Sequence, residues 1–176
     1  MKERLSREAI AMRIAKEFRF EATHRLRRHE GACRNLHGHS YRLVVEVEGR
    51  RQLGGPATGM VLDFSTLSHC VRSVLEDDGQ SVPFDHATIL HVDDELTFSL
   101  QQHTARTGED LRLVLLTEEP TAEYMAELFA SLVQDNIDIA FEGAEEVPQV
   151  VRIELWETAK SRAIWDAYDT ASDPGE

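Results

Sequence analysis

The amino-acid sequence predicts a single α+β domain, and three observations support that class. Apolar and polar residues alternate in two segments, roughly 12–25 and 36–49, with the period of a half-buried β-strand. In two later segments apolar residues recur every three or four positions, as in a helix that packs on a core. A chain of 176 residues, of which 41% are hydrophobic, is long enough to bury such a core.

The two predicted N-terminal strands carry histidines on their apolar faces. In the second strand, His37 and His39 share one face with the apolar residues that follow at every second position. In the first strand, His24 ends the apolar face that includes Phe20. A loop that contains Cys33 joins the two strands. Three imidazoles can therefore converge across neighbouring strands, with a thiol nearby.

Two helices are predicted from apolar spacing and from residues that can cap them. The first begins near Asp63 or Ser65, either of which can accept a hydrogen bond from a free N–H group of the first turn. Its apolar positions are Phe64, Leu67, Cys70, Val71, Val74 and Leu75. The second begins at Pro120-Thr121, where Thr121 is the predicted cap. Its apolar stripe consists of Met125, Leu128, Phe129, Leu132 and Val133.

The remaining segments complete the predicted order of strand, strand, helix, strand, helix and strand. Short apolar strands are predicted at 111–116 and 149–157. The segment 91–110 is polar and has no clear period, so we expect a long loop or an insertion there.

The charge and the cysteine content exclude several classes of function. A net charge of −13 argues against broad binding to nucleic acid or to anionic membranes, because both require a basic surface. The sequence has no run of about 18 apolar residues and no apolar signal-peptide core near its start. Cys33 and Cys70 are too few for a disulfide scaffold. We therefore expect a cytoplasmic protein with reduced thiols.

Three histidines in this arrangement favour a shared metal ion. A single half-buried histidine is usually an ordinary sheet residue. Three imidazoles on one apolar patch would leave several ring nitrogens without partners unless a ligand lies between them. Neutral imidazole binds zinc, and three protein ligands with an open fourth position are typical of a catalytic site. His24, His37 and His39 are therefore the predicted Zn²⁺ ligands.

Further positions carry groups suited to proton transfer or ligand binding. Glu157 ends an apolar strand face, so its carboxylate must reach solvent or bind a partner such as the N–H groups of a pterin or guanine ring. In Asp85-His86 the carboxylate can orient the imidazole and raise its basicity. Together with Cys33, this pair forms a candidate set for proton transfer if the fold brings the three residues together.

Basic residues form two clusters in an otherwise acidic chain, the first of them in the loop around the predicted metal site. Such clusters suit a small phosphorylated substrate held by charge-assisted hydrogen bonds, although a solvated surface loop is an equal alternative. The clusters consist of Arg25, Arg27, Arg28 and Arg34, and of Lys160 and Arg162.

Six motifs occur in the order found in one enzyme family. They are Phe20–Leu26, Cys33-x3-His37-Gly38-His39, Gly59–Phe64, Phe84-Asp85-His86, Pro120–Glu123 and Trp156-Glu157-Thr158. The chain therefore resembles the 6-pyruvoyl-tetrahydropterin synthase / 6-carboxytetrahydropterin synthase family over residues 12–165. Outside this range we expect an N-terminal extension at 1–11 and a disordered acidic tail at 166–176.

The resemblance implies a tunnelling fold and a particular assembly. In that fold, ββααββ subunits with an antiparallel sheet and helices on one face assemble into an oligomeric β-barrel. The usual assembly is a homo-oligomer, a hexamer made of two trimers, with active sites at subunit interfaces. The implied cofactor is zinc, and the implied substrate is 7,8-dihydroneopterin triphosphate.

The resemblance also implies roles for individual residues. It makes Cys33 the residue that abstracts a proton, Asp85 and His86 its relay, and Glu157 the anchor of the pterin ring. The further residues expected to bind the substrate are Arg34, Thr121 and Lys160.

The spacing between Cys33 and His37 distinguishes two branches of that family. Three intervening residues are similar to the branch that forms 6-carboxy-5,6,7,8-tetrahydropterin for queuosine biosynthesis, with loss of triphosphate and acetaldehyde. The pyruvoyl branch has a longer gap and eliminates triphosphate only. We expect the carboxy product. Two other hypotheses stay open: a non-catalytic zinc-containing pterin-binding protein, and a zinc-dependent hydrolase in which Cys33 and Glu157 are expendable.

Overall fold

The computed structural model describes residues 11–76, 79, 82–109 and 111–169. The strands are β1 (Ala11–His24), β2 (His37–Arg50), β3 (Ala87–His91), β4 (Leu113–Leu116), β5 (Gln149–Trp156) and β6 (Arg162–Asp166). The α-helices are α1 (Phe64–Leu75), α2 (Glu95–Thr107) and α3 (Ala122–Ala140), and a 3₁₀ turn spans Ala32–Arg34.

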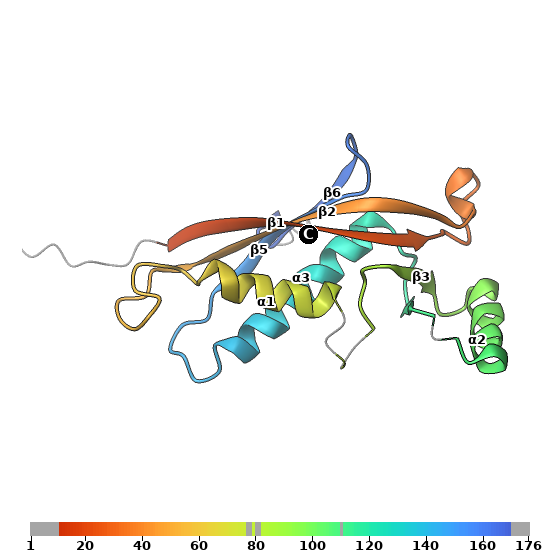
Figure 1. Cartoon of the computed structure of the whole chain (residues 1–176). Helices are drawn as coiled ribbons and strands as arrows, with labels where there is room; N and C mark the ends of the chain where they lie inside the picture. The colour runs from red at the N-terminus through yellow and green to blue at the C-terminus, as the bar shows by residue number, and fades with distance from the viewer. Residues whose placement is uncertain (1–10, 77–78, 80–81, 110, 170–176) are drawn as a thin grey trace, which may run out of the picture.

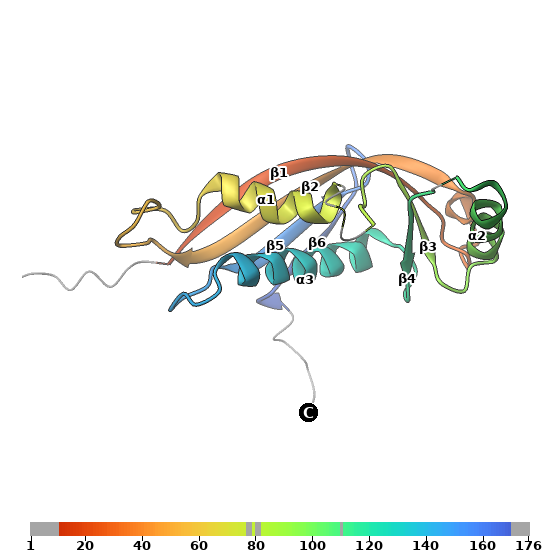
Figure 2. The same cartoon turned by 60° about the horizontal axis from the view of Figure 1, so that its bottom comes forward.

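One curled sheet forms the body of the molecule (Figures 1 and 2). Its strand order is β4-β3-β1-β2-β5-β6. The long strands β1 and β2 form an antiparallel hairpin in which His24 lies opposite His37. Figure 2 shows the sheet arching over α1 and α3, which cover the same face. The predicted placement of these helices on one face of the sheet is confirmed.

Both predicted helices are confirmed, and their caps follow from local sequence. Asp63 caps α1 by accepting a hydrogen bond from the Ser65 N–H group at 2.6 Å. Thr121 caps α3 in the same way, at 3.2 Å from an N–H group of the first turn. The apolar stripe of α3 packs on the sheet, where the ring of Phe129 meets that of Phe20 edge-on at 5.6 Å between centroids.

The sheet is mixed, which corrects the expectation of a wholly antiparallel one. β3 runs parallel to β1 and to β4, whereas the pairs β1–β2, β2–β5 and β5–β6 are antiparallel. β3 has five residues and is buried at four of them, so it lacks the alternation that marks a half-exposed strand. β6 is equally short. The short length of both strands, together with the burial of β3, explains why the sequence pattern does not reveal them.

The segment 91–110, predicted as a long loop or an insertion, contains helix α2. Of the 13 residues of α2, only Thr97 is buried, so the sequence has no apolar stripe that would identify the helix. Figure 1 places α2 at one end of the molecule, beyond β3. No helix in the described part of the chain is long and apolar enough to cross a membrane.

The C-terminal boundary lies later than predicted. Asp166 is the last residue of β6, and the hydroxyl group of Tyr168 donates a hydrogen bond to Glu48 at 2.8 Å. The predicted disordered tail is therefore part of the fold as far as residue 169. The rest of that tail, and positions 1–10 of the predicted N-terminal extension, lie outside the described residues.

Asp94 ties α2 to the end of β1 through a buried ion pair. Its carboxylate is 3% exposed and accepts hydrogen bonds from Arg25 Nε at 2.7 Å and from the Leu96 N–H group at 2.8 Å. Burial raises the pKa of Asp94, but these hydrogen bonds outweigh burial and hold the pKa below its ordinary value. The carboxylate of Asp94 therefore binds a proton more readily in the unfolded chain than in the folded protein. The stabilisation is present above about pH 4 and is lost as the pH falls through the folded pKa.

We expect Asp94→Asn to lower the free energy of unfolding by about 2 kcal/mol near neutral pH. Asparagine keeps the helix cap but leaves Arg25 without its counter-charge. Urea denaturation of the metal-free protein measures the loss, which should shrink toward about pH 3. The matched control is Asp93→Asn, because Asp93 is 75% exposed and its ion pair should contribute less than about 1 kcal/mol. If both variants lose the same free energy of unfolding, the stabilising role of the buried pair between Asp94 and Arg25 is contradicted.

Candidate functional site

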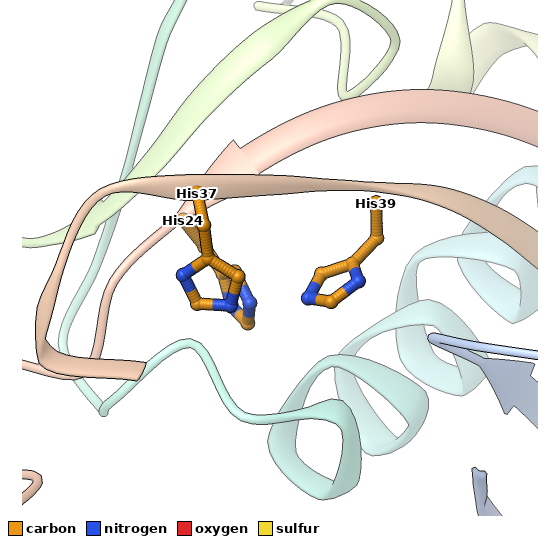
Figure 3. A group of neighbouring side chains, drawn as sticks. All are labelled: His24, His37 and His39. Carbon is orange, nitrogen blue, oxygen red and sulfur yellow. The ribbon is translucent and has the colours of Figure 1, made fainter. Parts of the chain in front are cut away.

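Three imidazoles converge where β1 ends and β2 begins. The hairpin register places His24 opposite His37, and His39 lies two residues further along the same face of β2. One nitrogen from each ring lies within 4.8 Å of a nitrogen from each of the other two. Figure 3 shows the rings of His24 and His37 next to one another, with the ring of His39 facing them. The sequence-based grouping of these three histidines is confirmed.

Backbone carbonyl groups orient two of the rings. Nδ1 of His24 lies 2.7 Å from the carbonyl oxygen of Pro120, and Nδ1 of His37 lies 2.8 Å from that of Asn35. A carbonyl oxygen only accepts, so Nδ1 of each ring is the donor, and the neutral form of each ring has its free lone pair on Nε2. A metal-binding histidine is usually oriented in this way, with one ring nitrogen free for the metal and the other donating a hydrogen bond to a carbonyl group.

The electrostatic environment favours the neutral form of His24 and His39. Burial is the main cause that lowers the pKa of His24, which is 2% exposed, and the neighbouring imidazoles lower it further. Burial also lowers the pKa of His39. The Nε2 atoms of His24 and His39 are buried and have no hydrogen-bond partner. Two buried acceptors without partners, together with neutral imidazoles, fit a bound zinc ion.

Glu157 lies directly beside this cluster. β5 pairs with β2 through Trp156 and Arg42, and this register carries Glu157 toward the histidines. Its Oε1 atom is 3.4 Å from Nε2 of His24 and 3.8 Å from Nε2 of His39. The carboxylate thus faces the site, as its position on the apolar side of the strand predicts, and it is available to a metal ion or to the N–H groups of a ligand.

Tyr41 is a further neighbour that spacing alone does not distinguish from a core residue. It follows His39 on the same face of β2, and the two rings lie 5.5 Å apart between centroids. Its hydroxyl group is buried without a hydrogen-bond partner. Burial raises the pKa of Tyr41, and the negative charge of Glu157 raises it further. The hydroxyl therefore stays protonated and is available as a donor close to His39.

A small pocket of about 180 Å³ opens next to the cluster. It brings together four of the predicted residues, because Cys33 and Thr121 line it with His24 and Glu157. Cys33 is half-buried on the 3₁₀ turn that precedes β2. The other lining residues are Leu26, Ala122, Glu123, Ser161, Arg162 and Ala163.

Asp85 and His86 lie away from this pocket. They form the predicted pair, with Asp85 Oδ2 2.9 Å from His86 Nδ1. The other carboxylate oxygen accepts a hydrogen bond from the Glu21 N–H group at 2.9 Å. His86 borders a second hollow, which is lined by Glu21 and Thr23 and also by His39. The side chains of Glu21 and Thr23 alternate with that of His24 and point to the opposite face of β1. Within one chain, the pair is therefore not beside Cys33.

The basic residues near the site are in different situations. Arg25 is paired with Asp94, and Arg27 with Glu119 at 2.7 Å, so their charges are already compensated. Arg162 lies over the ring of Trp156, 4.4 Å from its centroid. The side chains of Arg28, Arg34 and Lys160 are exposed and do not line the pocket. For Arg25 and Arg27, the structure supports ion pairs within the fold over phosphate binding.

Comparison with known proteins agrees with the site. Residues 13–167 match the family model described as 6-pyruvoyl tetrahydropterin synthase. The chain belongs to this family. It is 36% identical over 154 residues to the 6-carboxy-5,6,7,8-tetrahydropterin synthase of Haemophilus influenzae, with 85% of this chain and 94% of that protein covered. It is 32% identical over 165 residues to the synthase of the same name from Aquifex aeolicus, with the same coverage.

Solved structures share the fold. An uncharacterized protein from Wolinella succinogenes superposes with a TM-score of 0.68 at 26% identity, covering 90% of this chain and 99% of its own. The Caenorhabditis elegans 6-pyruvoyl tetrahydropterin synthase gives a TM-score of 0.59 at 19% identity, covering 90% and 97%. The predicted family, the α+β tunnelling fold and the assignment as an enzyme of this family are confirmed. The oligomeric barrel and the cytoplasmic location stay predictions.

Proposed function

We propose that the protein is a zinc-dependent 6-carboxy-5,6,7,8-tetrahydropterin synthase that acts on 7,8-dihydroneopterin triphosphate. The observation that carries the proposal is the pocket lined by Cys33, Glu157 and His24, next to the cluster that His24 forms with His37 and His39. The names of the Haemophilus and Aquifex relatives support the carboxy product. The three-residue gap between Cys33 and His37 supports it as well.

The histidines are suited to hold the metal ion through nitrogens that the fold leaves free. His24 and His37 would bind it through Nε2, because Nδ1 of each ring donates to a backbone carbonyl. His39 would supply the third imidazole. When bound, zinc supplies a Lewis acid that polarises the side-chain oxygens of the substrate and acidifies the adjacent C–H bond.

The other residues in and around the pocket are assigned to proton transfer and to substrate binding. We propose that Cys33 takes the proton from that C–H bond, since its thiol lines the pocket and the histidines are reserved for the metal. Glu157 accepts hydrogen bonds from the N–H groups of the pterin ring. Thr121 lies at the N-terminus of α3, where free N–H groups favour an anionic part of the substrate. Arg34 and Lys160 are exposed around the site and suit the triphosphate.

Assembly supplies a reason for the location of Asp85 and His86. Neither residue of the pair lines the pocket that contains Cys33, and His86 borders a different hollow, so the pair does not serve Cys33 of its own chain in this proposal. We propose that a homo-oligomer, a hexamer made of two trimers, brings the pair of one chain to the pocket of another. The sheet ends at β4 and β6, whose outer edges are unpaired among the described residues and therefore suit strand pairing between subunits.

Product analysis tests the proposal. The zinc-loaded protein is incubated with 7,8-dihydroneopterin triphosphate, and the pterins are separated by chromatography. We expect 6-carboxy-5,6,7,8-tetrahydropterin, triphosphate and acetaldehyde in equal amounts. A pyruvoyl product with triphosphate would instead assign the other branch of the family. If neither triphosphate nor a new pterin is formed, the proposed activity is contradicted, and a non-catalytic pterin-binding protein becomes the favoured hypothesis.

A further inference from the structure

The connection between β4 and α3 is fixed at three consecutive residues. Glu119 pairs with Arg27, the carbonyl oxygen of Pro120 accepts the Nδ1 proton of His24, and the hydroxyl of Thr121 caps α3. The middle one of these three contacts orients a predicted metal ligand. The other two contacts hold the backbone on either side of that carbonyl group.

The pair of Glu119 and Arg27 is more than a single surface ion pair. One carboxylate oxygen accepts from Arg27 Nε at 2.7 Å, and the other accepts from the Arg27 backbone N–H at 3.1 Å. The Arg27 side chain is 18% exposed, and its Nη2 atom lies 2.9 Å from Nε2 of His91 at the end of β3. A carboxylate that binds both the backbone and the side chain of one residue fixes that residue in position and orientation.

These contacts connect the segment 24–27 to the segment 119–120 at both ends. Arg27 follows His24 by three residues, and Glu119 precedes Pro120 directly. Any movement of Glu119 relative to Arg27 therefore displaces the carbonyl group that orients the His24 ring. The N–H group of Leu26 also donates to the carbonyl oxygen of Cys33 at 2.9 Å, so the loop that carries the thiol closes next to Arg27.

We infer that Glu119 and Arg27 form a positioning pair that sets the orientation of His24 and the placement of the Cys33 loop. The part that concerns turnover rests on the proposed function, whereas the part that concerns metal binding does not. Partners that orient a metal-binding histidine typically change metal affinity by about 10–100-fold when removed. Glu119 touches neither the predicted metal site nor the pocket, so its effect is transmitted through Pro120 and Arg27.

The experiment compares Glu119→Gln with Glu118→Gln. Both changes remove one negative charge from the same connection, but Glu118 is exposed and lies outside the pair. Competition with a chromophoric chelator gives the zinc dissociation constant. We expect Glu119→Gln to weaken zinc binding by about tenfold or more, and Glu118→Gln to leave it unchanged. In the pterin assay, Glu119→Gln should lower kcat with little change in KM, because the pocket walls that hold the ring are intact.

A double-mutant cycle with Arg27→Gln tests whether the two residues act together. We expect the double variant to bind zinc about as weakly as the weaker single variant, since either change breaks the same pair. Wild-type zinc affinity in Glu119→Gln, or independent losses that multiply in the double variant, would overturn the inference. If Glu119→Gln does not fold, Arg27→Lys gives the same measurement, because lysine keeps the charge and the backbone N–H but not the Nε contact. If the wild-type protein shows no pterin turnover, the proposed function fails while the zinc affinities still decide this inference.

Discussion

His39→Ala is expected to lose zinc and turnover together while the metal-free protein keeps its stability. Removing one of three protein ligands should weaken zinc binding by more than the roughly 100-fold that an outer partner contributes. Metal-assisted activation of a substrate contributes several kcal/mol, so turnover should fall by about 10³-fold. Zinc content after gel filtration and the pterin assay measure the two effects.

The stability of this variant separates a metal ligand from a packing residue. Nε2 of His39 is buried without a partner, so the metal-free protein loses no hydrogen bond at that atom when the ring is removed. We therefore expect the melting temperature without metal to change little, and zinc to raise it in the wild type only. The matched control is His69→Ala, because His69 is exposed on α1. A His39→Ala protein that still binds one zinc ion tightly would contradict the assigned ligand set.

The sequence predicts those parts of the site that depend on residues close to one another along the chain. Alternation along β1 and β2 places His24, His37 and His39 on one apolar face, and antiparallel pairing of these two successive strands brings the residues together. The caps at Asp63 and Thr121 are equally local, because each side chain binds an N–H group within three residues. Such features depend on backbone geometry that a short segment specifies by itself.

The features that the sequence does not predict depend on contacts between distant segments. The partners of Arg25 and Arg27 are Asp94 and Glu119, each more than 60 residues away along the chain. The sequence shows the basic cluster but not the acids that neutralise two of its members. Similarly, the position of Glu157 beside the histidines depends on the pairing of β5 with β2. A strand-end glutamate carries no local sign of which strand it will face.

Helix α2 is missed by the sequence analysis for a different reason. A helix that buries one threonine needs no apolar stripe, so its sequence is that of a polar loop. Its attachment to the body of the protein relies on the Asp94 ion pair rather than on apolar burial. Polar attachment of this kind is specific in three dimensions but has no period along the chain.

Cys33→Ala is expected to abolish most of the turnover while the protein keeps its zinc. The thiol lines the pocket beside His24 but does not belong to the cluster of potential ligands found among the described residues. Its loss should therefore leave zinc affinity within about twofold, because the three imidazoles and their carbonyl partners are untouched. A positioned acid or base contributes about 10²–10⁴-fold, so kcat should fall by that factor. The zinc titration and the pterin assay on the same preparation measure both quantities.

Chemical modification provides an independent check on the thiol, because the sequence contains only two cysteines. Cys33 is half-buried at the pocket, whereas Cys70 is buried in α1, where burial raises the pKa of its thiol. Alkylation should therefore modify Cys33 first and inactivate the wild type in step with one modified thiol per chain. Bound pterin should slow that reaction by covering the pocket. Full turnover in Cys33→Ala would show that another group takes the proton and would contradict the role proposed for Cys33.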